Sequence, residues 1–323
     1  MRILVTGAAG FIGFHTAKRL CSDGHQVVGV DNLNSYYSVE LKQARLSQLK
    51  PYRNFQFQLL DVADKQALLD LFAENAFDQV VHLAAQAGVR YSIDNPDVYA
   101  QSNLVGFLNV LEACRAHRPA HLIYASSSSV YGLNDRMPYA TTDAVDQPVS
   151  FYAATKRANE LMAHAYSHLY GIPTTGLRFF TVYGPWGRPD MAPIKFTDAI
   201  LNGRTIDVYN DGAMSRDFTY IDDIVEGLVR LLPLPPTDQA GVPNKVYNIG
   251  LGSPVKLLDF IGCIEEALGI HAIKKFLPLQ SGDVVDTWAD TRELAHRVGF
   301  RPQVALPVGV QSLIHWYRNY YGV

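Results

Sequence analysis

The chain has 323 residues, of which 48% are apolar and 18% are charged, so it can bury a sizeable core as one large or two ordinary domains. Its formal charge of -3, without a basic arm or an arginine run, predicts no nucleic-acid partner. Apolar runs all fall short of the roughly eighteen residues that cross a bilayer, which predicts no membrane partner.

The cysteine pattern bears on the cellular compartment. Cys21, Cys114 and Cys263 are odd in number, widely spaced and each set in an apolar helical pattern. That arrangement is typical of neither a disulfide framework nor a zinc site. The chain opens almost directly into RILVTG, without the pattern of a signal peptide. We therefore expect a cytoplasmic protein with no bound metal.

Strand and helix patterns alternate through the first half of the chain. Strands are predicted by the short apolar runs RILVT, HQVVGV, FQFQLL, DQVVHLA, HLIYAS and TTGLRFF. Between them, apolar residues recur at three- and four-residue intervals over 11–24, 98–117 and 151–171, which predicts helices. This alternation indicates an α/β fold with a doubly wound parallel sheet of the Rossmann type.

The pattern loosens after about residue 180, where PWGRPDMAP and LLPLPPTDQAGVP interrupt it. We expect residues 1–180 to form a nucleotide-binding domain. Residues 181–323 should form a smaller, irregular α/β substrate domain, part of which, around 215–250, packs back on the first.

The first predicted strand runs into TGAAGFIG, in which Gly7, Gly10 and Gly13 open a helix. Glycines allow a tight turn and a close approach of backbone amides to a pyrophosphate at the helix N-terminus. Asp31 ends the next strand, where a carboxylate accepts hydrogen bonds from a ribose and repels a 2'-phosphate, which favours NAD over NADP. Taken singly, these features also suit a plain strand–helix turn and a solvated acid.

A tyrosine and a lysine, Tyr152 and Lys156, share one helix face at i and i+4. The strand HLIYAS delivers the serines 126–129 at its carboxyl end. A free phenol has a pKa near 10, and a neighbouring cation that lowers it by roughly three units poises the group for proton transfer near neutrality. A pair exposed on a helix surface would be the ordinary alternative, but the glycine turn and Asp31 favour catalysis.

With these motifs in place, the chain resembles the extended short-chain dehydrogenase/reductase family, and within it the nucleotide-sugar epimerases. The resemblance covers TGAAGFIG, DNLNSYY, HLAAQAGVR, ASSSSVYG, YAATK, LRFFTVYGPWGRPDMAP, SRDFTYIDDI, YNIG and SGDVVDTWAD. It implies Ser127, Tyr152 and Lys156 as the catalytic residues, with Lys156 also on the nicotinamide ribose. It implies NAD as a cofactor that stays bound, held by Gly7, Gly10, Phe11, Ile12, Gly13, Asp31, Asn32, Asp61, Val62, Leu83, Ala84, Ala85, Asn103, Tyr152, Lys156 and Phe179.

Two segments indicate which reaction and which sugar. Relatives that dehydrate or decarboxylate nucleotide sugars place an acid in the serine segment, whereas this chain has SSSSVYG, which favours epimerisation. The segment FFTVYGPWGRPDMAP resembles that of UDP-glucuronate 4-epimerases, in which the arginine matching Arg188 meets the hexuronate carboxylate. An arginine fork binds a carboxylate bidentately, and the Thr181 hydroxyl can donate to the same group. A loop arginine that caps a turn is the alternative.

The resemblance also implies a set of sugar- and nucleotide-binding residues. Arg90 is expected near the sugar, with a helix-capping or interdomain role as the alternative. Arg216 matches the family arginine that pairs with the nucleotide diphosphate, and Tyr209 is expected over the uracil. Gln280 departs from the arginine of UDP-glucose/UDP-galactose epimerases, and His82 receives no catalytic role. The predicted substrate-binding residues are Ala87, Arg90, Ser127, Ser128, Ser129, Thr181, Arg188, Tyr209, Arg216, Gln280 and Asp283.

We therefore expect reversible C4 epimerisation of a UDP-hexuronic acid, UDP-glucuronate to UDP-galacturonate, through a 4-keto sugar. The alternatives are a UDP-glucose/UDP-galactose 4-epimerase, a UDP-glucuronate decarboxylase and a non-catalytic NAD-sensing protein. The resemblance further implies a homodimer formed by the helices near 97–117 and 150–170, whose apolar faces permit that interface.

Overall fold

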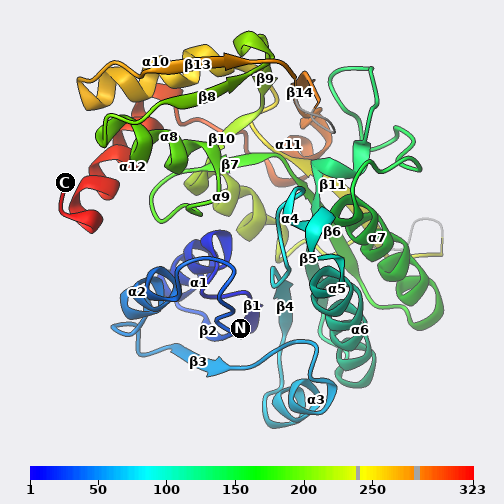
Figure 1. Ribbon diagram of the computed structural model, residues 1–323. Coiled ribbons are helices and arrows are strands. Elements are labelled where there is room, and N and C mark those ends of the chain that lie inside the picture. Colours follow the sequence, from blue (N-terminus) through cyan, green and yellow to red (C-terminus); the bar gives the residue numbers. More distant parts are fainter. Residues whose placement is uncertain (238–240, 280–283) are drawn as a thin grey trace. The chain divides into compact units, whose positions relative to one another are not determined.

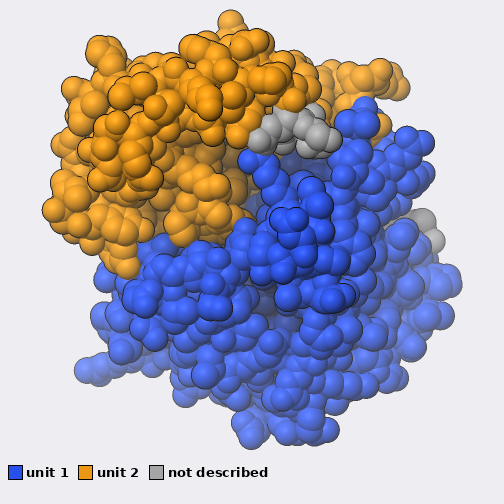
Figure 2. Space-filling view, in the orientation of Figure 1, with its two compact units in different colours: residues 1–133, 141–179, 228–248 blue, residues 134–140, 180–227, 249–323 orange. Residues whose placement is uncertain are grey.

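The computed structural model describes residues 1–237, 241–279 and 284–323, so the predicted Gln280 and Asp283 lie outside the described residues. The chain forms two compact units, shown in different colours in Figure 2. The first unit comprises residues 1–133, 141–179 and 228–248, and the second comprises residues 134–140, 180–227 and 249–323.

A seven-stranded sheet forms the centre of the first unit, with the strand order β11-β6-β5-β4-β1-β2-β3. The pairs from β6 to β3 are all parallel. The predicted Rossmann arrangement and its six strands are therefore confirmed, and β11 is a seventh strand that the sequence pattern did not indicate. The strands are β1 (Arg2–Thr6), β2 (Gln26–Asp31), β3 (Phe55–Leu59), β4 (Gln79–His82), β5 (His121–Ser127), β6 (Thr174–Phe179) and β11 (Asn244–Ile249).

Helices cover both faces of this sheet (Figure 1). Because successive strand residues point to opposite faces, Leu4 and Val28 contribute to the core under α3, α6 and α7, while their neighbours Ile3 and Val27 are buried on the other face. Figure 1 shows α1 and α2 on that second face. The helices are α1 (Phe11–Ser22), α2 (Val39–Leu49), α3 (Lys65–Glu74), α4 (Tyr91–Asp94), α5 (Pro96–Tyr99), α6 (Gly106–His117) and α7 (Phe151–Tyr170).

The helix predicted over 98–117 is not one regular helix. Its first turn is α5, a π-helical segment follows at η1 (Ala100–Val105), and α6 completes it. The Asn103 carbonyl within η1 accepts a hydrogen bond from the Asn159 side chain of α7 at 2.7 Å. Such outside partners accompany the wider turn of a π-helix, which is frequent at functional sites.

The second unit combines short strands with longer helices. β7 (Thr181–Tyr183) pairs with β10 (Phe218–Tyr220), and β8 (Ile206–Tyr209) pairs with β13 (Lys274–Leu277). A third small sheet joins β12 (Val255–Lys256), β9 (Ser215–Arg216) and β14 (Asp286–Thr287). The remaining elements are α8 (Ala192–Leu201), η3 (Asn210–Gly212), α9 (Ile221–Leu231, which belongs to the second unit only as far as Gly227), α10 (Leu257–Leu268), α11 (Arg292–Val298) and α12 (Leu306–Tyr321).

Neither long apolar helices nor disulfides occur in the described part of the chain. Among residues 1–237, 241–279 and 284–323, no helix has the length and apolarity needed to cross a membrane. Cys21, Cys114 and Cys263 are unpaired thiols.

Candidate active site

Three glycines shape the turn between β1 and α1. Gly7 has φ +72°, and a Cβ there would come within 2.8 Å of the backbone that follows β4. A Cβ on Gly13 would lie 2.0 Å from the Gly7 carbonyl oxygen, so neither position accepts a side chain. Gly10 is the N-cap of α1, and the first turn, which begins with Phe11 and Ile12, carries no acidic residue. The turn therefore leaves a backbone cradle at the positive end of a helix, as a pyrophosphate requires.

The Asp31 carboxylate closes one side of this cradle at the end of β2. Its Oδ2 accepts a hydrogen bond from the Ala9 amide at 3.1 Å, and its Oδ1 accepts one from the Leu33 amide at 2.9 Å. Burial raises the pKa of the Asp31 carboxyl, while these amides and the charges of Lys42 and Arg45 oppose that rise. The predicted ribose-binding acid is thus fastened to the glycine turn itself.

Two basic side chains near Asp31 were not predicted from the sequence to have a role in the site. Arg45 on α2 is fully buried and donates to the Ala9 carbonyl at 2.8 Å and to the Tyr37 hydroxyl at 2.7 Å. Lys42, one helical turn earlier, donates to the Asn34 side chain at 2.8 Å. The sequence feature that contains them is a pair of basic residues at i and i+3, on the helix that follows DNLNSYY.

Asn32, Asp61 and Val62, which the resemblance places near the nucleotide, lie together at the ends of β2 and β3. The Asn32 amide donates to Asp61 Oδ2 at 2.9 Å, and Asn109 of α6 donates to the Val62 carbonyl at 3.0 Å. The structure therefore brings residues from two neighbouring strands and one helix to the same edge of the sheet.

The backbone after β4 is held by a buried threonine–histidine pair. The Thr6 hydroxyl accepts hydrogen bonds from the Leu83 and Ala84 amides at 3.2 and 3.1 Å and lies 2.8 Å from His82 Nδ1. Burial and the charge of Lys156 lower the pKa of His82 to about 3, so the imidazole is neutral at physiological pH. His82 therefore packs and hydrogen-bonds within the sheet, and it supports the predicted Leu83–Ala85 segment.

The tyrosine and lysine lie in the first two turns of α7. The Tyr152 amide donates to Ser92 Oγ at 3.2 Å, and the Tyr152 ring meets the Tyr99 ring edge-on at 6.0 Å. Lys156 Nζ donates to the Ala125 carbonyl of β5 at 2.9 Å. Burial lowers the pKa of the Lys156 ammonium to about 8, which leaves it largely protonated at neutral pH. The lysine therefore brings a fixed positive charge to the carboxyl end of β5.

The serine segment forms a tight turn directly after β5. Ser127 is the N-cap of η2 (Ser128–Tyr131), and its hydroxyl accepts a hydrogen bond from the Ser129 amide at 3.2 Å. The same hydroxyl donates to Ser129 Oγ at 3.1 Å. Ser127 at the end of β5 is the strand partner of the buried Phe179 at the end of β6. The resemblance also assigns Phe179 to the cofactor site. Ser128 and Ser129 are half-buried.

A buried ion pair next to this turn was also not predicted from the sequence. Glu160 of α7 and Arg178 of β6 form a bidentate pair with N–O distances of 2.8 and 2.9 Å. The Ser126 hydroxyl donates to Glu160 at 2.6 Å, and Arg178 donates to the Tyr131 hydroxyl at 3.0 Å. Burial alone would raise the pKa of Glu160, but the hydrogen bonds and charge of Arg178 outweigh it and lower that pKa. The pair ties α7, β5, β6 and η2 together.

Asn103 is buried and engaged by protein groups. Its Oδ1 accepts from the Gln86 amide at 2.8 Å, and its Nδ2 donates to the Gln86 carbonyl and to Thr155 Oγ1, each at 3.0 Å. These contacts join η1 to the loop after β4 and to α7. The side chain thus has a clear role in holding the predicted site, whereas its contact with a cofactor stays a prediction.

Ala87 and Arg90 occupy the loop between β4 and α4. The Ala87 carbonyl accepts from the Tyr99 hydroxyl at 3.0 Å, and the Arg90 carbonyl accepts from the Ile93 amide at 2.9 Å. The Arg90 residue is exposed. The geometry within this unit leaves both the sugar-binding and the helix-capping interpretations of Arg90 open.

In the second unit, Thr181 and Arg188 lie at the start of β7 and in the loop that follows it. Thr181 is half-buried, and its amide donates to the Asp217 carbonyl at 3.1 Å. Arg188 Nε donates to Asp190 Oδ1 at 3.0 Å, and its Nη2 pairs with Asp190 Oδ2. The guanidinium predicted to bind a carboxylate therefore holds a carboxylate of its own loop bidentately.

Arg216 and Tyr209 occupy two different small sheets of this unit. Arg216 Nη1 donates to the Ser215 and Val285 carbonyls at 2.9 and 2.8 Å, and Tyr209 is half-buried at the end of β8. Next to Arg216, the fully buried Asp217 accepts from the Leu251 amide at 2.7 Å and from two further amides. Asp217 therefore holds the loops after β11 and β14 against β9. It lies in the quoted motif SRDFTY, but no role was predicted for it from the sequence.

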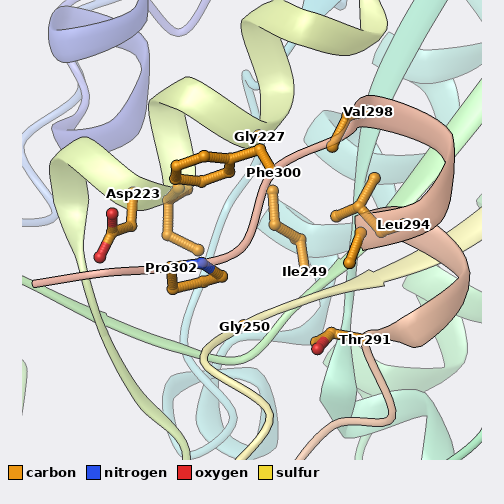
Figure 3. Close-up of a pocket in the computed structure, with 11 residues that line it drawn as sticks. Asp223, Gly227, Ile249, Gly250, Thr291, Leu294, Val298, Phe300 and Pro302 are labelled. Atoms are coloured by element: carbon orange, nitrogen blue, oxygen red, sulfur yellow. The ribbon is translucent and has the colours of Figure 1, made fainter.

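A small pocket of the second unit is a packing feature. Figure 3 shows its lining of mainly apolar side chains, among them Ile249, Leu294 and Phe300. The cavity of about 10 Å³ has room for a single water molecule. Asp223, at its edge, already accepts hydrogen bonds from the amides of Gln303 and Val304 at 3.0 and 2.9 Å. Of the predicted substrate-binding residues that the structure describes, none lines this pocket.

The parallel sheet, the glycine cradle with its carboxylate and the buried lysine after a tyrosine define a dinucleotide-binding protein of the Rossmann class. A family model described as the NAD dependent epimerase/dehydratase family matches residues 3–250. The chain belongs to this family.

Three known proteins are similar to the chain over nearly its full length. An uncharacterized 37.6 kDa protein of Escherichia coli O111:H- is 58% identical, with 100% of both chains covered. A probable UDP-glucuronate 4-epimerase of Rhizobium meliloti is 50% identical over 99% of this chain and 98% of that protein. The crystal structure of UDP-glucuronic acid 4-epimerase from Bacillus cereus, in complex with UDP-glucuronic acid and NAD, has a TM-score of 0.92 and 34% identity, covering 99% of this chain and 100% of that chain.

Proposed function

We propose that the protein is an NAD-dependent UDP-glucuronate 4-epimerase, which interconverts UDP-glucuronate and UDP-galacturonate. The observation that carries this proposal is the full-length similarity to the Rhizobium and Bacillus proteins named for this activity. The geometry supports it because Lys156 is anchored to β5 one helical turn after Tyr152, at the carboxyl end of a strand where this fold binds its ligands.

When bound, NAD supplies a reversible hydride acceptor for C4 of the sugar. The glycine cradle suits its pyrophosphate because Gly7 and Gly13, where a Cβ would collide with neighbouring backbone, allow the tight turn that places backbone amides at the N-terminus of α1. Tyr152 removes the proton of the C4 hydroxyl and returns it after the ketone has turned its other face. Lys156 favours the phenolate form by its positive charge. Ser127 adds a hydroxyl for the same sugar oxygen.

Arg188 and Thr181 suit the carboxylate that distinguishes a uronic acid from a neutral sugar. A guanidinium holds a carboxylate ionised and in a fixed plane through two parallel hydrogen bonds. The 4-keto form of a uronic acid is a β-keto acid, which loses carbon dioxide when the breaking bond aligns with the carbonyl π system. We propose that the arginine and the threonine hold the carboxylate away from that alignment.

Proton NMR of the purified protein with UDP-glucuronate and no added cofactor tests the proposal. We expect the galacto isomer to appear, because NAD is regenerated at each turnover and stays bound. In a parallel sample with UDP-glucose, turnover of that sugar but not of UDP-glucuronate would identify a neutral-sugar epimerase. Formation of a UDP-pentose and carbon dioxide from UDP-glucuronate would identify a decarboxylase. If the NMR spectrum of UDP-glucuronate stays unchanged while NAD is bound to the protein, the result would favour an NAD-sensing protein.

We also propose a cytoplasmic homodimer formed through α6 and α7. Apolar side chains on these helices are exposed in the single chain: Leu108 by 40%, Leu161 by 56% and Leu169 by 65%. Such exposure is expected of a face that another copy covers. Light scattering after size exclusion should give twice the chain mass, and Leu161→Lys with Leu169→Lys should give the mass of one chain.

A further inference from the structure

The loop that carries Arg188 begins with a tryptophan in a rare backbone conformation. Trp186 has φ +64°, in the left-handed region that residues with a side chain seldom adopt. Such a conformation persists where the surrounding structure holds it, and it is frequent at ligand-binding sites. On its C-terminal side, the Arg188 carbonyl accepts from the Met191 amide at 3.2 Å, and α8 then begins.

Aromatic side chains of the last helix, α12, hold this tryptophan. The Trp186 ring lies 5.4 Å from the Trp316 ring and 5.2 Å from the Tyr320 ring. Trp316 and Tyr320 are i and i+4 on α12, and their rings stack at 5.6 Å with an interplanar angle of 18°. Rings at these separations attract one another beyond their buried area. The tryptophan therefore docks on two rings that already support each other.

The helix that provides these rings is itself firmly attached to its unit. Leu313 and Ile314 of α12 are buried, and Arg318 donates to the Leu268 carbonyl at the end of α10 at 3.0 Å. The Tyr317 hydroxyl donates to Asp198 of α8 at 2.9 Å. Both flanks of the Arg188 loop, Trp186 before it and α8 after it, are thus connected to α12.

The guanidinium has its own restraint within the loop. The bidentate contact with Asp190 uses Arg188 Nε and Nη2 and fixes the plane of the fork. Because an arginine side chain has several rotatable bonds, recognition of a carboxylate requires that both its backbone and its plane be fixed. The aromatic contacts supply the first restraint and Asp190 supplies the second.

We propose that Trp316 and Tyr320 are specificity-positioning residues, which act through Trp186 to hold Arg188 where it receives the carboxylate of the sugar. This inference rests on the proposed function. It assigns to the C-terminal helix a part in the choice between a uronic acid and the corresponding neutral sugar. Loss of either ring then weakens the binding of the charged sugar more than that of the neutral one.

The test compares dissociation constants for UDP-glucuronate and UDP-glucose by titration calorimetry. All proteins carry Tyr152→Phe to prevent turnover and are saturated with NAD. We expect Tyr320→Leu to reduce the preference for UDP-glucuronate by about 10-fold, the scale of one charge-assisted hydrogen bond. Tyr320→Phe keeps the ring and should keep the preference. General loosening of the fold would weaken the binding of both nucleotide sugars equally and leave the ratio unchanged.

Action through Arg188 is tested by a double-mutant cycle. In an Arg188→Ala background the preference is already low, and we expect Tyr320→Leu to change it no further. If Tyr320→Leu does not fold, Trp186→Gly, which relaxes the left-handed backbone and removes the anchor, carries the same expectation. An unchanged ratio in Tyr320→Leu or Trp186→Gly, or an equal further loss without Arg188, overturns the inference. Absence of any preference in the parent protein would instead count against the proposed function.

Discussion

The buried pair between Glu160 and Arg178 leads to a quantitative prediction on stability. Their side chains are only 2% and 3% exposed, and removal of one partner from a buried ion pair costs about 3–5 kcal/mol of the free energy of unfolding. Glu160→Gln takes the counter-charge from a buried guanidinium, so we expect the upper value. Arg178→Met leaves Glu160 with hydrogen bonds from Ser126 and Arg157, so we expect the lower value, about 3 kcal/mol.

Urea unfolding of the NAD-loaded protein, followed by circular dichroism, measures these differences. The double variant Glu160→Leu with Arg178→Met should be more stable than Glu160→Gln, because no uncompensated charge remains buried. His121 at the opposite end of β5 provides a matched control: it is fully buried, and His121→Asn disturbs a polar contact without touching the pair. Equal costs of the two single variants, or a double variant that loses their sum, would refute the electrostatic reasoning.

Low pH should reduce the difference in the free energy of unfolding between the parent protein and Arg178→Met. The pKa of Glu160 is lowered in the folded protein, where Arg178 outweighs the opposing effect of burial. A carboxyl with a lowered folded-state pKa stabilises the protein fully above its unfolded pKa, about 4.3, and loses that effect as the pH falls through the folded value. The stability gap between the parent protein and Arg178→Met should therefore narrow below about pH 4.

Three further predictions concern the site itself. Tyr152→Phe should lower kcat by at least about 100-fold and leave bound NAD in place, as quantified by turnover and by the nucleotide released on denaturation. Gly13→Ala should lose bound NAD, since its Cβ would lie 2.0 Å from the Gly7 carbonyl oxygen; an NAD content equal to that of the parent would contradict the crowded turn. The His82 ring protons should show no titration in NMR spectra between about pH 5 and 8, because burial and Lys156 hold the imidazole neutral.

The sheet and the cradle could be predicted because each depends on residues close together in the sequence. Runs of branched apolar residues fix the strands, and the glycines of TGAAGFIG belong to one turn. In a parallel sheet the topology then brings the ends of separate strands to one edge, which is why Asp31 and Ser127 could be assigned to that edge. The seventh strand, β11, lacked such a signal, because Asn244–Ile249 follows a loop-like stretch and pairs with β6, which is distant in the sequence.

Residues that hold the predicted catalytic groups in place were harder to predict, because each pairs with a residue that is distant in the sequence. Glu160 continues the four-residue spacing of Tyr152 and Lys156, so its position on the same helix face could be inferred. Its partner Arg178 lies in another element, and local periodicity gives no means of choosing it among the other basic residues of the chain. The same holds for Trp186, whose partners on α12 lie more than a hundred residues later. The residues predicted to act on cofactor and sugar therefore belong to local sequence motifs. The contacts that position them join distant parts of the chain and are seen only in the folded structure.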